Sequence, residues 1–211
     1  MTRARFVAVF LLGAALGASV SGTVVRAEAA GDPVRGRTVF AEEGCVRCHF
    51  PPGQGRGMGP PIEEIGRPQG ALHLAGRLWN HAPAMFAVLR QEGAKWPELT
   101  PERMADLMAF LQADPSRDAP PDPFQGQVLL LRKGCLKCHR LRGEGGSVAL
   151  ELTKYQGRYE SAVVWATTIW NHSPRMAAHA AGTGVLYPRF TGDEMGNLVE
   201  FLRRATAVAP R

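Results

Sequence analysis

Two five-residue segments carry the residue types with the clearest chemistry. Cysteine, two intervening residues, cysteine and histidine occur in order at residues 45–49 and again at residues 135–139. Two cysteines at this spacing can add to the two vinyl groups of one porphyrin, and the histidine that follows can then bind the iron. The pattern predicts two covalently bound haem c groups, attached through Cys45, Cys48, Cys135 and Cys138, with His49 and His139 as the proximal iron ligands.

Other chemistry is known for paired cysteines. Two such pairs can form a zinc site, and one pair can form a thioredoxin-like redox motif. Both alternatives leave the histidine after each pair unexplained. The chain has 4 cysteines and both motifs together use all of them, so none remains for a disulfide.

The chain also contains an internal repeat, which extends well beyond the cysteines. The segment Trp79-Asn80-His81-Ala82-Pro83-Ala84-Met85 matches Trp170-Asn171-His172-Ser173-Pro174-Arg175-Met176, and Trp96-Pro97 matches Tyr187-Pro188. The offset is 90 residues at the cysteines and 91 residues afterwards. Each copy has about 80 residues, a small size for a domain that depends on core burial alone. A covalently bound haem would supply the missing apolar core of each copy.

Both copies predict the same helices. Asp32 and Pro33 form a helix start, Gly44 a helix end, and Asp122, Pro123 and Gly134 repeat this pattern. The last helix begins at Thr100 in the first copy, and in the second copy Thr191 caps it with Glu194 completing a capping box. Nothing alternates with period two over a useful length, so the fold class is all-α, with short helices joined by loops. The predicted domains are 31–113 and 123–206, with a proline-rich, extended and semi-rigid linker at 114–122.

Residues 1–27 have the pattern of an export signal. Arg3 and Arg5 precede an apolar stretch, and small residues follow near Ala27. We expect cleavage there and a periplasmic location, with an uncleaved membrane anchor as the alternative. Cleavage removes three of 25 basic residues and leaves 22 against 19 acids, so the formal charge falls from +6 to +3. This mild charge indicates no nucleic-acid partner and suits docking to an acidic redox protein.

Each copy resembles a class I cytochrome c domain, in which an N-terminal helix, the haem motif and loops precede a C-terminal helix that packs across the first. Gly36 and Gly126 match the helix-crossing glycine of that family, and Phe110 and Phe201 match its aromatic partner. The whole chain resembles the tandem diheme cytochromes that carry electrons in the bacterial periplasm. The resemblance implies two domains, each wrapped around one haem. It also implies partners among periplasmic redox proteins or a membrane-bound respiratory complex, and no small-molecule substrate.

The sequence departs from that family at the position of the distal iron ligand. Trp96-Pro97 and Tyr187-Pro188 stand where a methionine and a proline are usual. The repeated segment offers two replacements in each copy. Met85 and Met176 are favoured, because each follows an expected proline turn and a thioether keeps the potential of a carrier high. The rivals are His81 and His172, and an open site is the third possibility.

The remaining aromatic, asparagine, histidine and methionine residues are expected to have structural roles. Trp79 and Trp170 are expected to form haem walls, and Asn80 and Asn171 to form turns. His73, His179 and Met58 have no repeat counterpart, and the two histidines are expected to be surface or packing residues. Met104 and Met195 are expected in the core.

Three functions remain open at this point. The favoured one is an electron carrier that is not itself an enzyme, alone or as the haem subunit of a larger oxidoreductase. A diheme peroxidase would need one haem with an open distal side and an acid or base beside it. A haem-based sensor ranks lowest, because no signalling domain is visible.

Overall fold

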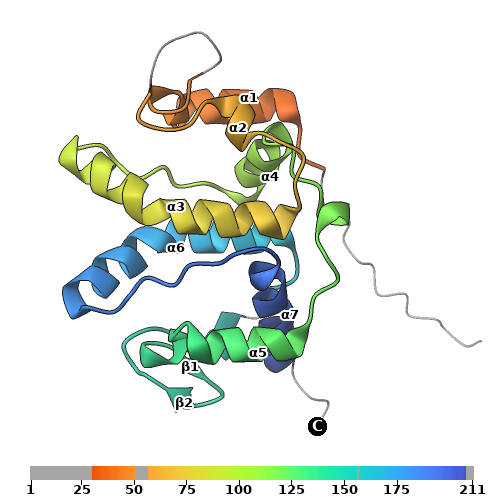
Figure 1. Ribbon diagram of the computed structural model, residues 1–211, viewed down its shortest axis with the longest axis vertical. Helices are drawn as coiled ribbons and strands as arrows, with labels where there is room; N and C mark the ends of the chain where they lie inside the picture. Colours follow the sequence, from red (N-terminus) through yellow and green to blue (C-terminus); the bar gives the residue numbers. More distant parts are fainter. Residues whose placement is uncertain (1–29, 51–56, 156, 208–211) are drawn as a thin grey trace, which may run out of the picture.

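A computed structural model describes residues 30–50, 57–155 and 157–207, and the predicted export signal at 1–27 lies outside them (Figure 1). The described chain is mostly helical. Its α-helices are α1 (Pro33–Glu42), α2 (Ile62–Ile65), α3 (Ala71–Gln91), α4 (Pro101–Phe110), α5 (Pro123–Arg132), α6 (Ala162–Thr183) and α7 (Glu194–Thr206). Four 3₁₀ turns accompany them: η1 (Cys45–Arg47), η2 (Pro115–Arg117), η3 (Cys135–Lys137) and η4 (Leu152–Tyr155).

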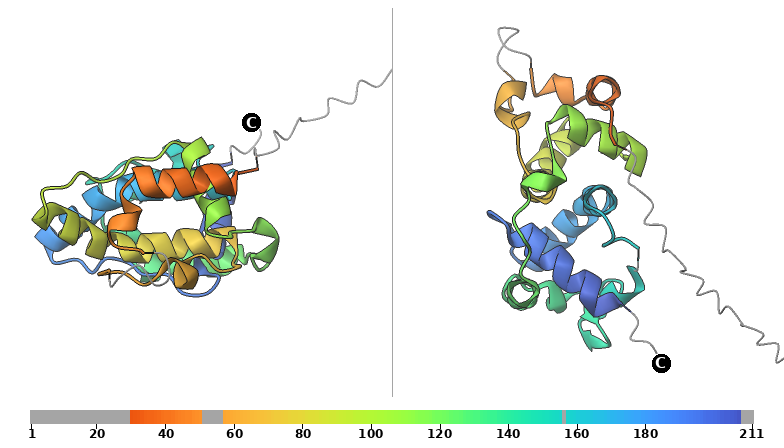
Figure 2. Two further views of the ribbon diagram at one scale, coloured as in Figure 1. Left: turned by 90° about the horizontal axis from the view of Figure 1, so that it is seen from above. Right: turned by 90° about the vertical axis from the view of Figure 1, so that its right-hand side faces the viewer.

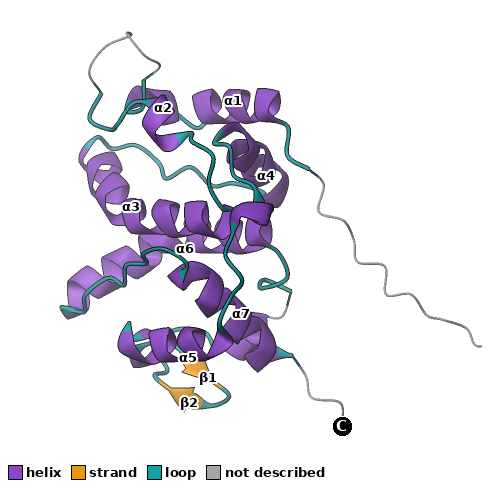
Figure 3. Cartoon of the chain, turned by 45° about the vertical axis from the view of Figure 1, so that its right-hand side comes forward, coloured by secondary structure: helices purple, strands orange, loops and turns teal. Residues whose placement is uncertain are grey.

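The described residues contain one short antiparallel hairpin, which the sequence did not predict. Strand β1 (Arg140–Leu141) pairs with β2 (Glu144–Gly145), with Arg140 opposite Gly145 (Figure 3). The hairpin follows the second haem motif directly. Glycine at 143 and 145 adopts positive φ angles there, which permits the tight turn.

The two halves of the chain lie one above the other. Helices α3 and α6 run side by side through the centre, with α1 and α4 packed on one side and α5 and α7 on the other (Figures 1 and 2). The first and last helices of each half cross each other, so the second half repeats the arrangement of the first. The side chains of both halves join in a single apolar core.

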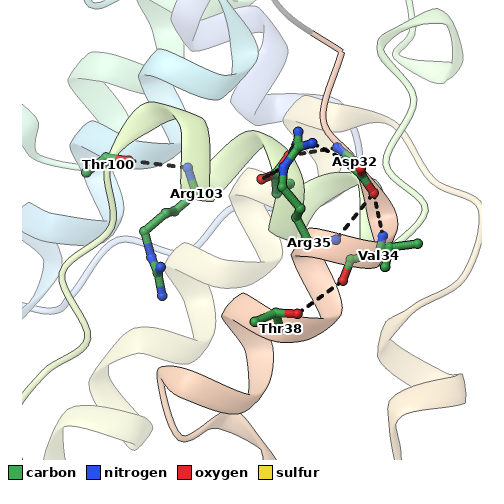
Figure 4. A network of polar contacts seen from close by, with 7 residues as sticks. Asp32, Val34, Arg35, Thr38, Thr100 and Arg103 are labelled. Atoms are coloured by element: carbon green, nitrogen blue, oxygen red, sulfur yellow. Dashed lines mark hydrogen bonds and ion pairs between the residues drawn. The ribbon is translucent and has the colours of Figure 1, made fainter.

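The predicted helix starts are confirmed at three of the four positions. Asp32 caps α1 by accepting from the backbone N–H of Val34 at 2.7 Å (Figure 4). Asp122 caps α5 in the same way. Thr100 caps α4. The fourth prediction is wrong: α7 begins at Glu194, and its N-cap residue is Asp193 rather than Thr191.

Only one arm of the predicted capping box forms at that helix. The Glu194 carboxylate accepts from the Thr191 backbone N–H at 2.8 Å. The Glu194 N–H, however, bonds to the Thr191 backbone carbonyl oxygen rather than to its hydroxyl. A turn over residues 191–193 therefore precedes the helix, and the helix starts later than the sequence pattern indicated.

The crossing glycines are confirmed by the packing of the terminal helices. A Cβ atom added at Gly36 would lie 1.9 Å from the Asp106 carbonyl oxygen and 2.7 Å from the Cβ of Phe110. At Gly126 it would lie 2.7 Å from the Cβ of Phe201. Only glycine permits this close approach of two helix backbones, so both residues fix how the helices cross.

The expectation of short helices is wrong for α3 and α6, which have 21 and 22 residues. The expected proline turn before Met85 and Met176 is wrong too, because Pro83 and Pro174 lie inside these helices. Proline has no N–H to donate to the carbonyl four residues earlier, and this loss bends a helix without ending it here. The far ends of α3 and α6 diverge at the left of Figure 1, each toward its own half.

The linker is docked rather than free-standing. Its Asp118 carboxylate accepts from the backbone N–H groups of Leu72 at 3.0 Å and His73 at 3.2 Å. These groups belong to the first turn of α3, which is preceded by Gly70 and so has no capping side chain of its own. Asp118 therefore caps α3 from a distant part of the sequence.

Candidate haem-binding sites

Each cysteine motif forms the same tight turn. Gly44, at a φ of 75°, ends the preceding helix, and the His49 backbone N–H donates to the Cys45 carbonyl oxygen at 2.9 Å. In the second half Gly134 has a φ of 71°, and His139 donates to Cys135 at 3.0 Å. These turns hold two thiols and one imidazole close together, as attachment of a porphyrin requires.

The two histidines predicted to be proximal ligands are buried and oriented alike. Each has 7% of its surface exposed. Nδ1 of His49 lies 2.9 Å from the Pro60 carbonyl oxygen, and Nδ1 of His139 lies 2.9 Å from the Leu150 carbonyl oxygen. A carbonyl oxygen can only accept, so Nδ1 carries the proton in both rings. Nε2 is then left with its lone pair, which is the arrangement typical of a metal-binding histidine.

A cavity of about 410 Å³ opens beside the first motif. Cys45 and His49 line one part of it, and His81 and Met85 of α3 line another. Its volume is that of a pocket for a small-molecule ligand or cofactor, and most of its other walls are apolar. The residues present therefore fit a haem attached at Cys45 and Cys48.

Burial also affects the cysteine thiols of both sites. It raises the pKa of Cys45 and of Cys135 to about 11. Thiols with such pKa values are protonated at neutral pH.

On the far side of each site a second histidine faces the proximal one. The ring centroids of His49 and His81 are 5.7 Å apart, and those of His139 and His172 are 6.2 Å apart. Met85 lies one helical turn beyond His81 on the cavity wall. Burial, followed by the charge of the proximal histidine, lowers the pKa of His81, and the same causes in the same order lower the pKa of His172 to about 4. A lowered pKa favours the neutral ring, which is the form that binds a metal.

The tryptophans of the repeated segment bind the opposite half of the chain. Nε1 of Trp79 donates to the Pro188 carbonyl oxygen at 2.6 Å, and Nε1 of Trp170 donates to the Pro97 carbonyl oxygen at 2.7 Å. Trp170 lines the cavity of the first half rather than a site in its own half. Trp79 stacks on Tyr187 of the second half, with ring centroids 4.7 Å apart.

The asparagines that follow are not turn formers, because both lie inside long helices. Asn80 makes a pair of hydrogen bonds with the backbone of Phe190, at 2.6 and 2.8 Å. Asn171 makes the equivalent pair with Leu99, at 3.0 and 2.8 Å. Sequence reasoning missed this role. The only signal was that asparagine follows tryptophan at the same offset in both copies.

The residues before Pro97 and Pro188 do not line the first cavity. Trp96 packs against Trp170, with ring centroids 4.6 Å apart, and its buried Nε1 has no hydrogen-bond partner among the described residues. Arg77 adds a positive charge to the wall of the first cavity.

His73, His179, Met104 and Met195 lie where the sequence predicted. His73 and His179 are exposed. Met104 and Met195 are almost fully buried on the last helix of each half, and Met58 is 69% exposed. None of these five residues lines the first cavity.

Comparison with known families agrees with the first site. Residues 33–113 match the cytochrome c family. This part of the chain is a cytochrome c domain, with a covalent haem c at Cys45 and Cys48, and the family implies electron transfer through that haem. No curated protein and no solved structure matches the chain. None of the helices in the described residues is long and apolar enough to span a membrane.

Proposed function

We propose that the protein is a diheme c-type cytochrome that transfers single electrons between redox partners, alone or as the haem subunit of a larger oxidoreductase. One observation in particular supports the proposal of a second haem. The turn at Cys135 and Cys138 repeats the first turn bond for bond, including the 2.9 Å contact from the proximal histidine Nδ1 to a backbone carbonyl oxygen.

In this proposal the polypeptide holds and insulates the cofactors. The four cysteines attach the two haems, and His49 and His139 bind the iron of each. The haem supplies the one-electron change between oxidised and reduced iron. His49 and His139 are both buried, which limits their contact with water, and the Nδ1 hydrogen bonds fix the orientation of both rings.

We place the protein in the periplasm, with periplasmic redox proteins or a membrane-bound respiratory complex as its partners. The export pattern at residues 1–27 and the chemistry of c-type haem attachment support this location. No small-molecule substrate or nucleic acid is expected. A diheme peroxidase is less favoured, because a histidine faces the predicted proximal ligand in both halves.

Haem counting tests the proposal directly. The full chain is produced in a host that matures c-type cytochromes, and haem is quantified as the pyridine haemochrome and by intact mass. We expect two haems in the parent. The paired variants C45S/C48S and C135S/C138S should each retain one haem, and each serves as the control for the other. An unchanged haem count after C135S/C138S would refute the second site.

Electron transfer is then measured by stopped flow. The reduced protein is mixed with an oxidised small c-type cytochrome, and both haems should be reoxidised within the measurement. Peroxide-driven oxidation of a dye should not exceed the rate of free haem. A rate far above that level would instead favour the peroxidase.

A further inference from the structure

The opposed histidine pairs indicate how the distal side of each site is filled. His81 faces His49 and His172 faces His139, with interplanar angles of 64° and 62°. The same juxtaposition in both halves argues against an accident of packing.

The spacing of the pairs suits a shared metal ion. Imidazole nitrogens bind first-row metals at about 2 Å, so two rings bound on opposite sides of one ion have centroids roughly 6.3 Å apart. The observed separations of 5.7 and 6.2 Å are close to this value and slightly shorter. Met85 also lines the cavity, one helical turn beyond His81.

The bent helices explain why histidine holds this position. Trp79 and Asn80 are fixed to the second half by hydrogen bonds to the backbone of Pro188 and Phe190. His81 follows directly and is therefore anchored, and Pro83 bends the helix two residues later. Met85 lies beyond the bend, further from these anchors. The same order of residues in α6 anchors His172 in the second half.

We propose that His81 and His172 are the distal iron ligands, so that both haems are bis-histidine, and that Met85 and Met176 only pack against them. This inference rests on the proposed diheme function. It replaces the sequence-based preference for methionine and implies lower reduction potentials than histidine–methionine ligation gives.

The oxidised parent protein provides the first test, which needs no variant. Near-infrared absorption reports a sulfur-to-iron band only when a thioether binds the iron. We expect no such band, and low-temperature paramagnetic resonance should show two low-spin bis-histidine haems. A band that corresponds to one or both haems would overturn the proposal.

Matched variants provide the second test. M85L/M176L should keep the parent spectra, whereas H81A and H172A should each convert half of the haem to a form that binds carbon monoxide. Added imidazole should restore the low-spin spectrum of both histidine variants. Unchanged spectra in H81A, or loss of the low-spin signal in M85L/M176L, would contradict the assignment. A haem count below two would instead refute the diheme function, so the two failures are distinguishable.

Discussion

Substitution of Asn171 by alanine tests how firmly the two halves are joined. The Asn171 side chain makes two hydrogen bonds with the backbone of Leu99, at 3.0 and 2.8 Å, and Leu99 is only 4% exposed. A neutral hydrogen bond contributes about 0.5–1.5 kcal/mol, and buried groups left without a partner place the cost near the upper limit. We expect Asn171→Ala to lower the free energy of unfolding by about 2–3 kcal/mol. For a chain of this length, that corresponds to a Tm lower by roughly 4–12 °C.

Urea unfolding of the haem-loaded protein measures the effect, followed by far-ultraviolet circular dichroism and by haem absorption. Asn80→Ala removes the equivalent pair of bonds to Phe190 and should cost about the same. Gln125→Ala, at an exposed position of α5, should change stability by less than about 0.5 kcal/mol. Both probes should report one shared transition, because the halves form a single core. A cost for Asn171→Ala as small as that of Gln125→Ala, or separate transitions for the two halves, would refute the reasoning.

Three further predictions concern single residues that position the helices. Gly36→Ala should destabilise the fold by about 3 kcal/mol in urea unfolding, because the added Cβ would meet the Asp106 carbonyl oxygen of the crossing helix; a neutral effect would contradict this crossing. Asp118→Ala should cost about 1 kcal/mol and speed amide exchange in the first turn of α3, whose N–H groups it caps; unchanged exchange there would argue against a docked linker. The hydrogen bond from Arg35 lowers the pKa of Asp106. Its contribution to stability is therefore present above about pH 4 and lost as pH falls further, so Asp106→Asn should reduce the acid-induced loss of stability; an identical pH profile for the variant would refute this link.

The sequence by itself determined the local features of the protein. The two haem motifs, the helix caps at Asp32 and Asp122 and the crossing glycines are encoded by residues a few positions apart, or by a requirement that only one residue type meets. The repeat also showed that the segment from tryptophan to methionine matters in both copies. Such features could be predicted because each depends on the residue types at one turn, one helix end or one close contact.

Tertiary structure alone decided what each residue of that segment contacts. The packing of α3 against α6 directs Trp79 and Asn80 toward the second half, and it leaves His81 facing its own proximal histidine. Pro83 reads as a turn in the sequence but only bends α3, because packing on both sides of the bend holds the long helix together. The linker residue Asp118 likewise became a helix cap through a contact 46 positions away. These outcomes depend on how the two halves meet, and no local pattern records that geometry.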